Sequence, residues 1–404
     1  MSSCRNRETV ISDLPDELRE KIFDCMSTLD TARSALVSTQ WRDAWYRRDR
    51  LVFDQAFFES KPSSNKEGLS MTSLIYNILI LRSGPLKKFT LHILRSCGSD
   101  PWIQQLDIDR WCLYLSRNGI EELHLSGPHS GPKYKIPSSL FYCKTIKQLN
   151  LEEFTFDLPV NAPRVLFPGL KSISFKGVWL RGDNKGLLCS SMPKLEKLVL
   201  FHCYATPNYK ITAPELKSLT MCEYSTPGRI WLTLHLSSIK TLCIYLTWRY
   251  YYKGTTYTLE STAFPIALNL QEIKLHGFCF DTDYHLKYVL QLLNKSPKLC
   301  VLEIEFENMI KFEKRSEVAN PTLLENLIET ELKMLEIVKL NRFQGSEIEL
   351  CLVKLLLSNS PALHHVAIHE DLNINASLAS EATKKILNFP CASPKAQILY
   401  NSRI

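Results

Sequence analysis

The sequence predicts an α/β protein in which a small three-helix module is followed by a curved solenoid with a parallel sheet. Two observations lead to this prediction. A six-residue apolar pattern recurs eleven times from Leu86 onwards, whereas residues 11 to 53 show apolar residues at helical spacing. The chain has 404 residues, more than one hydrophobic core normally holds, which favours several domains or a repeat array.

The recurring pattern is a hexad that reads apolar-x-x-apolar-x-apolar. Its copies follow one another at steps of 21 to 36 residues, which is typical of leucine-rich repeats with insertions. Each copy ends in a short strand that cannot bury its apolar face alone, so stacked copies should form a curved parallel sheet. The copies begin at Leu86, Ile120, Ile146, Leu170, Leu195, Leu216, Ile239, Leu270, Leu299, Leu335 and Leu363.

Several connectors between the hexads predict helices. Apolar residues recur at helical spacing over residues 105–117, over residues 284–295, and again at Ile348, Leu352, Leu355 and Leu356. Such stripes are the core-facing sides of helices rather than cofactor sites. Proline often follows a connector just before the next hexad, where it ends the helix and favours an extended chain.

The amino-terminal segment predicts three short helices. Pro15 and the two acidic residues after it favour the first turn of a helix. Asp30 is a plausible N-cap for a second helix over residues 31–37, and Trp41 and Trp45 lie four apart on a third. Three helices of this size form a core too small to be stable alone, so the module should lean on the repeats or on a partner protein.

The order of apolar residues, proline and tryptophans in this segment carries a family resemblance. The relevant residues are Ile11, Leu14, Pro15, Leu18, Ile22, Phe23, Asp30, Ala32, Arg33, Ser38, Trp41, Arg42, Trp45, Leu51 and Phe53. In them the segment resembles the F-box family. Two departures stand out: Ser27 occupies the place of a usual proline, and Thr39-Gln40 replaces a commonly basic pair.

The resemblance implies that the helices bury an apolar face against a Skp1-type adaptor, which is tied to a cullin. It also implies which side chains contact the adaptor or hold the shape that does. These are Leu14, Pro15, Leu18, Ile22, Phe23, Leu36, Val37 and Trp41. A purely structural alternative is that residues 11 to 53 form a helical cap that shields the first repeat.

The carboxyl-terminal part resembles the FBD region found at the end of many plant F-box repeat proteins. The stretches that carry this resemblance are residues 335–340, 343–347, 356–361 and 386–394. We therefore expect an F-box over residues 8–55, a leucine-rich-repeat solenoid over residues 56–330, and FBD-like repeats with a cap over residues 331–404. Physically, the last region should supply two more repeat-like strands and a helix that closes the solenoid.

Composition and motifs exclude several functions. The sequence has no P-loop, no Gly-x-Ser-x-Gly and no Gly-x-Gly-x-x-Gly, and His364-His365 has no further ligands nearby, so we expect neither catalysis nor a metal or cofactor. The net charge of +7 is spread over the whole length, which argues against nucleic-acid binding. Without an apolar leader or a long apolar run, we expect no membrane contact.

The cysteines indicate the compartment. There are 13 of them, an odd number at irregular spacing, with no Cys-x-x-Cys pair. This pattern argues against a disulfide framework and for a reducing environment, so we expect the nucleus or the cytoplasm.

Two surfaces are candidates for binding a target. The segment after residue 245 is rich in aromatic and basic residues, which are enriched at interaction hot spots, although a strand extension packed on the body is an equal alternative. Its candidate contacts are Trp248, Arg249, Tyr250, Tyr251 and Tyr252. A basic set at the end of the F-box, namely Arg42, Arg47, Arg48 and Arg50, is more simply a solvated face or an adaptor rim.

The sequence thus favours the substrate-recognition subunit of a Skp1–cullin–F-box ubiquitin ligase, with the repeats binding a target protein. Two alternatives stay open: a repeat scaffold whose F-box is vestigial, and a nucleic-acid-associated protein, whose binding would fall steeply with salt.

Overall fold

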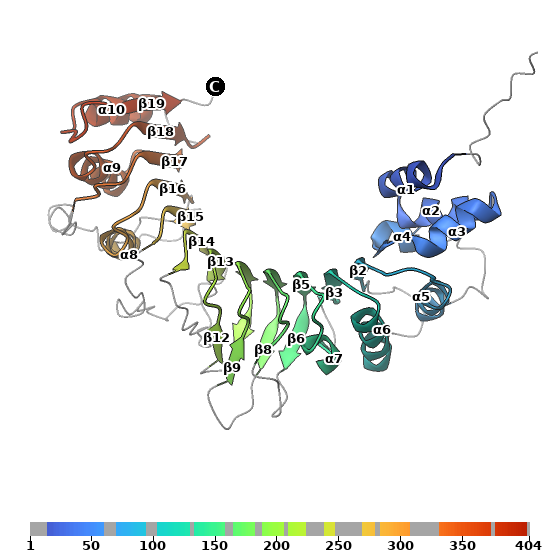
Figure 1. The fold of residues 1–404 in the computed structure, drawn as a ribbon. Helices are drawn as coiled ribbons and strands as arrows, with labels where there is room; N and C mark the ends of the chain where they lie inside the picture. Colours follow the sequence, from blue (N-terminus) through green and yellow to red (C-terminus); the bar gives the residue numbers. More distant parts are fainter. Residues whose placement is uncertain are drawn as a thin grey trace, which may run out of the picture. The chain divides into compact units, whose positions relative to one another are not determined.

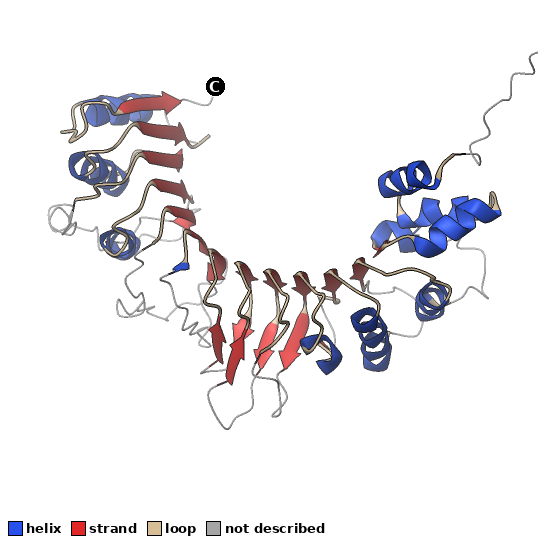
Figure 2. Cartoon of the chain, viewed as in Figure 1, coloured by secondary structure: helices blue, strands red, loops and turns tan. Residues whose placement is uncertain are grey.

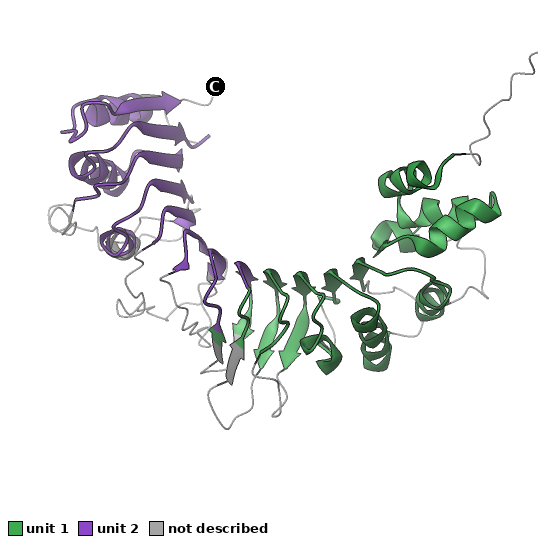
Figure 3. Cartoon of the chain, in the orientation of Figure 1, with its two compact units in different colours: residues 1–194, 203–211 green, residues 195–202, 212–404 purple. Residues whose placement is uncertain are grey.

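The computed structural model describes residues 14–59, 70–93, 103–129, 133–157, 165–181, 188–205, 209–223, 238–246, 269–278, 283–307, 331–372 and 376–401. The chain divides into two compact units (Figure 3). Unit 1 comprises Met1–Lys194 and Cys203–Ile211, and unit 2 comprises Leu195–His202 and Thr212–Ile404.

Unit 1 begins with a group of short helices. They are α1 (Asp16–Cys25), α2 (Thr28–Ser34), α3 (Thr39–Arg47) and α4 (Gln55–Glu59) (Figure 1). Between α3 and α4 the chain forms a short strand, β1 (Arg50–Phe53). The predicted three-helix module is therefore present, and it contains a strand in addition.

The repeats of unit 1 form parallel strands in the order β1, β2 (Lys88–His92), β3 (Glu122–Ser126), β5 (Gln148–Glu152) and β7 (Ser172–Lys176). Helices α5 (Met71–Ile80), α6 (Gln105–Arg117) and α7 (Ser138–Phe141) lie in the connectors. A second, smaller sheet contains β11 (Tyr204–Ala205), β8 (Trp179–Arg181), β6 (Phe154–Asp157) and β4 (Tyr134–Lys135), and β9 (Leu188–Ser191) pairs with β12 (Tyr209–Thr212).

Unit 2 continues the same pattern with eight parallel strands among its described residues. Their order is β10 (Lys197–Phe201), β13 (Ser218–Glu223), β14 (Thr241–Leu246), β15 (Glu272–Phe278), β16 (Val301–Phe306), β17 (Ile337–Phe343), β18 (His365–Glu370) and β19 (Gln397–Asn401). Helices α8 (Asp283–Asn294), α9 (Glu347–Asn359) and α10 (Ala376–Leu387) lie together on one side of these strands (Figure 2).

The eleven hexads lie on these strands, as the periodicity predicts. Neighbouring copies are in register: Leu123 pairs with Leu149, and Leu302 pairs with Val338. Every hexad residue is buried except Met221, which is half-buried. The apolar residues of the repeats therefore form a continuous core within each unit, and the stacking prediction is confirmed.

Strand β1 is a further repeat strand that the hexad pattern does not reveal. Its residues pair in parallel with β2, with Leu51 opposite Phe89 and Phe53 opposite Leu91. In the later repeats one carbonyl accepts two N–H groups from the next coil, as Lys87 O does from Glu121 and Glu122 at 2.8 Å each. The Asp49 carbonyl accepts from Lys87 and Lys88 in the same way, at 2.8 and 2.9 Å. The sheet thus starts inside the amino-terminal module.

Many strands end at a left-handed corner. Two residues after the last apolar residue of the hexad, the backbone φ is positive, between 52° and 74°. Glycine adopts this conformation freely, whereas other residues lose about 1–2 kcal/mol there. The corner residues are Glu153, Gly177, His202, Gly277 and Arg342.

The predicted connector helices are present. Helix α6 spans the residues expected and buries Ile108, Trp111, Cys112 and Leu115, and α9 buries the expected stripe of Ile348, Leu352, Leu355 and Leu356. Within the described residues, no helix has the length and apolar composition that crossing a bilayer requires. The carboxyl-terminal part has three strands, β17 to β19, and two helices, rather than the two strands and one helix that we expected.

The prediction for the second helix was wrong at its start. Helix α2 begins at Thr28, and its N-cap is Ser27, whose hydroxyl oxygen accepts from the Asp30 amide at 3.1 Å. Asp30 instead lies in the first turn, where its carboxylate accepts from the Ser27 hydroxyl at 2.7 Å. Serine thus supplies a side-chain cap at the position where the resembled family usually has proline.

A buried carboxyl group organises the start of α9. Glu349 is 4% exposed and accepts from the backbone amides of Ser346, at 2.8 Å, and Gln344, at 3.2 Å. In return the Ser346 hydroxyl accepts from the Glu349 amide, which completes a capping box. Burial raises the pKa of Glu349 to about 7, because desolvation outweighs these hydrogen bonds.

Replacing Ser27 tests the cap of α2. Ser27→Ala removes the side-chain acceptor and should lower the free energy of unfolding by about 1 kcal/mol. Ser27→Pro should cost less, because φ at Ser27 is −63° and Met26 before it is already extended, so proline fits and restricts the unfolded chain. Urea unfolding followed by tryptophan fluorescence compares the variants; a larger loss for proline than for alanine would contradict the assignment.

Glu349 should make stability depend on pH. Its pKa is about 7 in the folded chain against an ordinary 4.5, so the folded state retains the proton that the unfolded state releases between these values. The free energy of unfolding should therefore fall as the pH rises from 4.5 to 7, by up to about 3 kcal/mol.

The matched comparison is Glu349→Gln against Glu347→Gln, which removes an exposed carboxyl group from the same helical turn. The free energy of unfolding of Glu349→Gln, minus that of the wild type, should be higher at pH 8 than at pH 4. For Glu347→Gln this difference should not change with pH. An equal response of both variants in urea unfolding at the two pH values would show that Glu349 is not the group responsible.

Candidate functional site

Three helices at the amino end pack around a small aromatic core. The Phe23 ring lies 5.2 Å from the Trp41 ring, and both side chains are almost fully buried, at 2% and 4% exposure. Trp45 is also buried on the same face of α3. The module therefore uses its aromatic side chains internally to hold α1 against α3.

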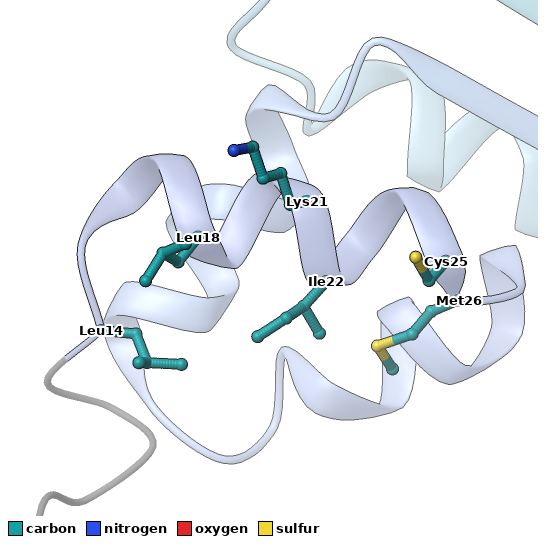
Figure 4. A pocket seen from close by; sticks show the side chains of 6 residues that line it. All are labelled: Leu14, Leu18, Lys21, Ile22, Cys25 and Met26. Carbon is teal, nitrogen blue, oxygen red and sulfur yellow. The ribbon is translucent and has the colours of Figure 1, made fainter.

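The outer face of α1 is apolar and open to solvent. An open hollow of about 410 Å³ runs along it and is lined by Leu14, Leu18, Lys21, Ile22, Cys25 and Met26 (Figure 4). Leu18 is 44% exposed, and Ile22 and Met26 are half-buried. These residues are spaced at three and four along the chain, so α1 presents a second apolar stripe away from the module's core.

A second exposed apolar pair lies in the turn after α2. Leu36 and Val37 are 87% and 67% exposed, and their backbone amides are bonded to Arg33 O and Ser34 O at 3.0 Å each. The turn is thus held by main-chain hydrogen bonds while its side chains point into solvent. Neighbouring large apolar side chains in water are typical of an interaction surface.

The eight predicted adaptor-binding residues fall into three groups. Leu14, Leu18 and Ile22 line the hollow, next to the exposed Pro15. Leu36 and Val37 project from the turn after α2. Phe23 and Trp41 lie in the core, so they shape the module and do not reach a partner. Ile11 lies outside the described residues.

Lys21 and Met26 line the hollow and were not among the predicted contacts. Their signal is present in the sequence, because Lys21 lies three residues after Leu18 and Met26 lies four residues after Ile22. Gln40, one of the two departures from the family pattern, accepts from the Arg19 guanidinium at 2.9 Å and so links α3 to α1.

The interpretation of the basic set as a solvated face or an adaptor rim was wrong for Arg48. Arg42, Arg47 and Arg50 are exposed, and Arg47 lies 3.4 Å from the Asp16 carboxylate. Arg48 is instead 7% exposed and donates to groups of the α1–α2 turn. Its burial follows from its position one coil before the first hexad, where the repeat places an inward-facing residue.

The predicted target-binding residues, Trp248, Arg249, Tyr250, Tyr251 and Tyr252, lie outside the described residues. Their neighbour Tyr245 on β14 is described. Its ring stacks on the His276 ring at 4.3 Å with an interplanar angle of 9°, and it lies 5.1 Å from the Phe201 ring. His276 Nδ1 is 2.7 Å from a Glu305 carboxylate oxygen. Strand alternation places these four side chains on the sheet face opposite the core of unit 2.

No group of three or more histidine, cysteine or acidic side chains could hold a metal ion in the described part of the chain. His364 and His365 are both exposed.

Comparison with known proteins matches two parts of the chain. Residues 11–53 match the F-box domain, and residues 108–231 match the model "FBD-associated F-box protein At5g56370, LRR repeats". The first match covers α1 to β1, and the second runs from within α6 to just beyond β13.

Several proteins of Arabidopsis thaliana are similar to this chain. The F-box/FBD/LRR-repeat protein At1g13570 is 26% identical over 96% of this chain and 98% of its own length. The putative F-box/LRR-repeat protein At3g42770 is 24% identical over 95% of this chain and 79% of its own length. The FBD-associated F-box protein At4g10400 is 30% identical, over 54% of this chain and 51% of its own length.

The chain therefore carries an F-box domain at its amino end, followed by leucine-rich repeats of the kind found in FBD-associated F-box proteins.

Proposed function

We propose that the chain is the substrate-receptor subunit of a Skp1–cullin–F-box ubiquitin ligase. The observation that carries the proposal is that the F-box match coincides with an open apolar hollow along α1. An F-box domain in general implies a Skp1-type adaptor as partner. Leu14, Leu18 and Ile22 are the side chains that would dock on it, with Leu36 and Val37 adding a second contact.

The proposed subunit acts without catalysis of its own. The adaptor ties it to a cullin, and the repeats bind a target protein, so that target lysines are held near a ubiquitin-loaded enzyme. Such an arrangement works by raising an effective concentration, which needs binding and geometry but no reactive groups. We propose the nucleus or the cytoplasm as the compartment, because the 13 cysteines are odd in number and irregularly spaced.

Target binding is proposed for the sheet face of unit 2 and for the segment that follows β14. The aromatic row of Phe201, Tyr245 and His276 includes a residue, Tyr245, that precedes this segment closely in the sequence, and the segment holds the candidates Trp248 to Tyr252. We propose the boundaries 8–55 for the F-box, 56–330 for the solenoid and 331–404 for the FBD-like region. The F-box match over residues 11–53 and the similarity to the F-box/FBD/LRR-repeat protein At1g13570 support the presence of these regions.

One observation favours a second candidate function, a repeat scaffold that needs no adaptor. The helices cover the first strand of the sheet, because the Val52 amide donates to the buried Thr28 hydroxyl at 2.9 Å. A module with this structural task would be kept even if it bound nothing. The scaffold predicts a stable chain with no affinity for a Skp1-type protein.

Leu18→Glu should abolish or strongly weaken adaptor binding. It places a carboxylate on the exposed face of α1, where docking would strip it of water, so the dissociation constant for a purified Skp1-type adaptor should rise by at least about tenfold. Isothermal titration calorimetry at micromolar concentrations measures the change.

The matched control is Leu106→Glu, since Leu106 is an exposed leucine of α6 in the same unit. This variant should bind like the wild type. If the wild type itself shows no affinity, the scaffold function takes the place of the ligase function. If both glutamate variants bind equally, the adaptor docks elsewhere.

A further inference from the structure

The first coil of the sheet has an arginine at the position where each of the eleven hexads has leucine or isoleucine. Counting back from Leu51 and Phe53, the first position of the hexad falls on Arg48. The backbone supports this alignment, because the next residue, Asp49, accepts the same two hydrogen bonds from the following coil as Lys87 does. Arg48 is therefore a guanidinium placed at an inward-facing position of the repeat.

The Arg48 guanidinium reaches the turn that joins α1 to α2. It donates to Met26 O at 2.9 Å, to Ser27 O at 3.4 Å and to the buried Thr31 hydroxyl at 2.6 Å. Burial lowers the pKa of Arg48, with Arg50 acting in the same direction, while Asp24 and Asp49 act against it. A buried group with this many directed bonds fixes the geometry of the turn.

At the carboxyl end of helix α1, the Met26 amide donates to Phe23 O at 3.1 Å. No basic residue lies in its last turn. Met26, its C-cap, is the residue whose carbonyl accepts from Arg48. Arg48 thus places a positive charge at the negative end of the α1 dipole, from a coil that is more than 20 residues further along the chain.

The same turn also contributes to the hollow on α1. The Met26 carbonyl accepts a hydrogen bond from Arg48, and the Met26 side chain lines the hollow together with Cys25. A second bond, from the Val52 amide to Thr28, joins the turn to β1. Since β1 pairs with β2 over four residues, the candidate adaptor surface is connected to the sheet through main-chain pairing and these two side chains.

We propose that Arg48 is a positioning residue for adaptor binding: it sets the orientation of α1, and so of the hollow, relative to the first repeats. This inference rests on the proposed function. Arg48 does not touch the adaptor, and it acts through the Met26 and Ser27 carbonyls.

Arg48→Leu is the decisive variant, because it installs a residue type that the eleven hexads have at this position. The sheet should remain folded, while α1 loses its carboxyl-terminal partner. The dissociation constant for a purified Skp1-type adaptor should rise by about tenfold. Backbone amides of α1 should exchange with deuterium about tenfold faster, with those of β2 and β3 unchanged.

Arg50→Leu is the matched control. Arg50 lies two residues after Arg48 and its side chain is exposed, so the substitution removes the same charge from the surface. It should change neither adaptor affinity nor exchange in α1. If Arg48→Leu fails to fold, Arg48→Lys replaces it: the ammonium retains the charge but lacks the planar fork, so a folded variant should show intermediate affinity and exchange.

Wild-type affinity together with wild-type exchange in α1, in whichever of the two Arg48 variants folds, would overturn the proposal. So would equal losses in Arg48→Leu and Arg50→Leu. If the wild type binds no adaptor, the proposed function fails, and the exchange measurement alone still decides whether Arg48 holds α1.

Discussion

The parallel pairing of β1 with β2 is the interaction on which the arrangement of unit 1 depends. A solenoid must begin somewhere, and its first strand exposes an edge of unpaired amides unless another element covers it. Here that strand lies inside the F-box domain, and its Val52 amide is covered by Thr28 of α2. The helices thus gain the support that a core of their size needs, and the repeats gain a cap. One short strand serves both purposes, so the docking module cannot move independently of the first coil without breaking main-chain hydrogen bonds.

The distribution of side chains in the helical module separates stability from binding. The interior contains the aromatic side chains of Phe23, Trp41 and Trp45. The aliphatic side chains of Leu18, Leu36 and Val37 are exposed to solvent. Covering one such aliphatic side chain gains about 1.5–3 kcal/mol, whereas association costs about 4–15 kcal/mol before any affinity appears. Two or three exposed residues would therefore not suffice. Under the proposed function, the hollow along α1 supplies the additional apolar area, so its orientation would matter as much as its composition.

Much of the fold could be predicted, because both periodicities are long and regular. The hexads and the stripes of α6, α8 and α9 repeat often enough to outweigh chance. The failures are local. Strand β1 was missed because Arg48 breaks the apolar pattern, and the start of α2 was misplaced because Ser27 and Asp30 are both good caps three residues apart. The short strands β6, β8 and β11 follow left-handed corners at Glu153, Gly177 and His202, which share no residue type that would predict them. At the candidate site, the sequence identified the apolar residues but not which of them are exposed. The structure shows that Leu18 faces solvent, whereas Phe23 lies in the core.

The left-handed corners connect the repeat to the surface proposed for targets. The backbone turns left-handed at Gly277 on β15 and at His202 just after β10. The residue just before each of these corners is the last one in its strand whose side chain faces solvent. In unit 2 these last positions carry His276 and Phe201, with Tyr245 between them on β14. His202, just after β10, adopts a left-handed backbone conformation that is unfavourable for a residue other than glycine. This is the strand at which the aromatic row begins. The in-register pairing of the strands, which sets Tyr245 opposite His276, thus brings the aromatic side chains into one row.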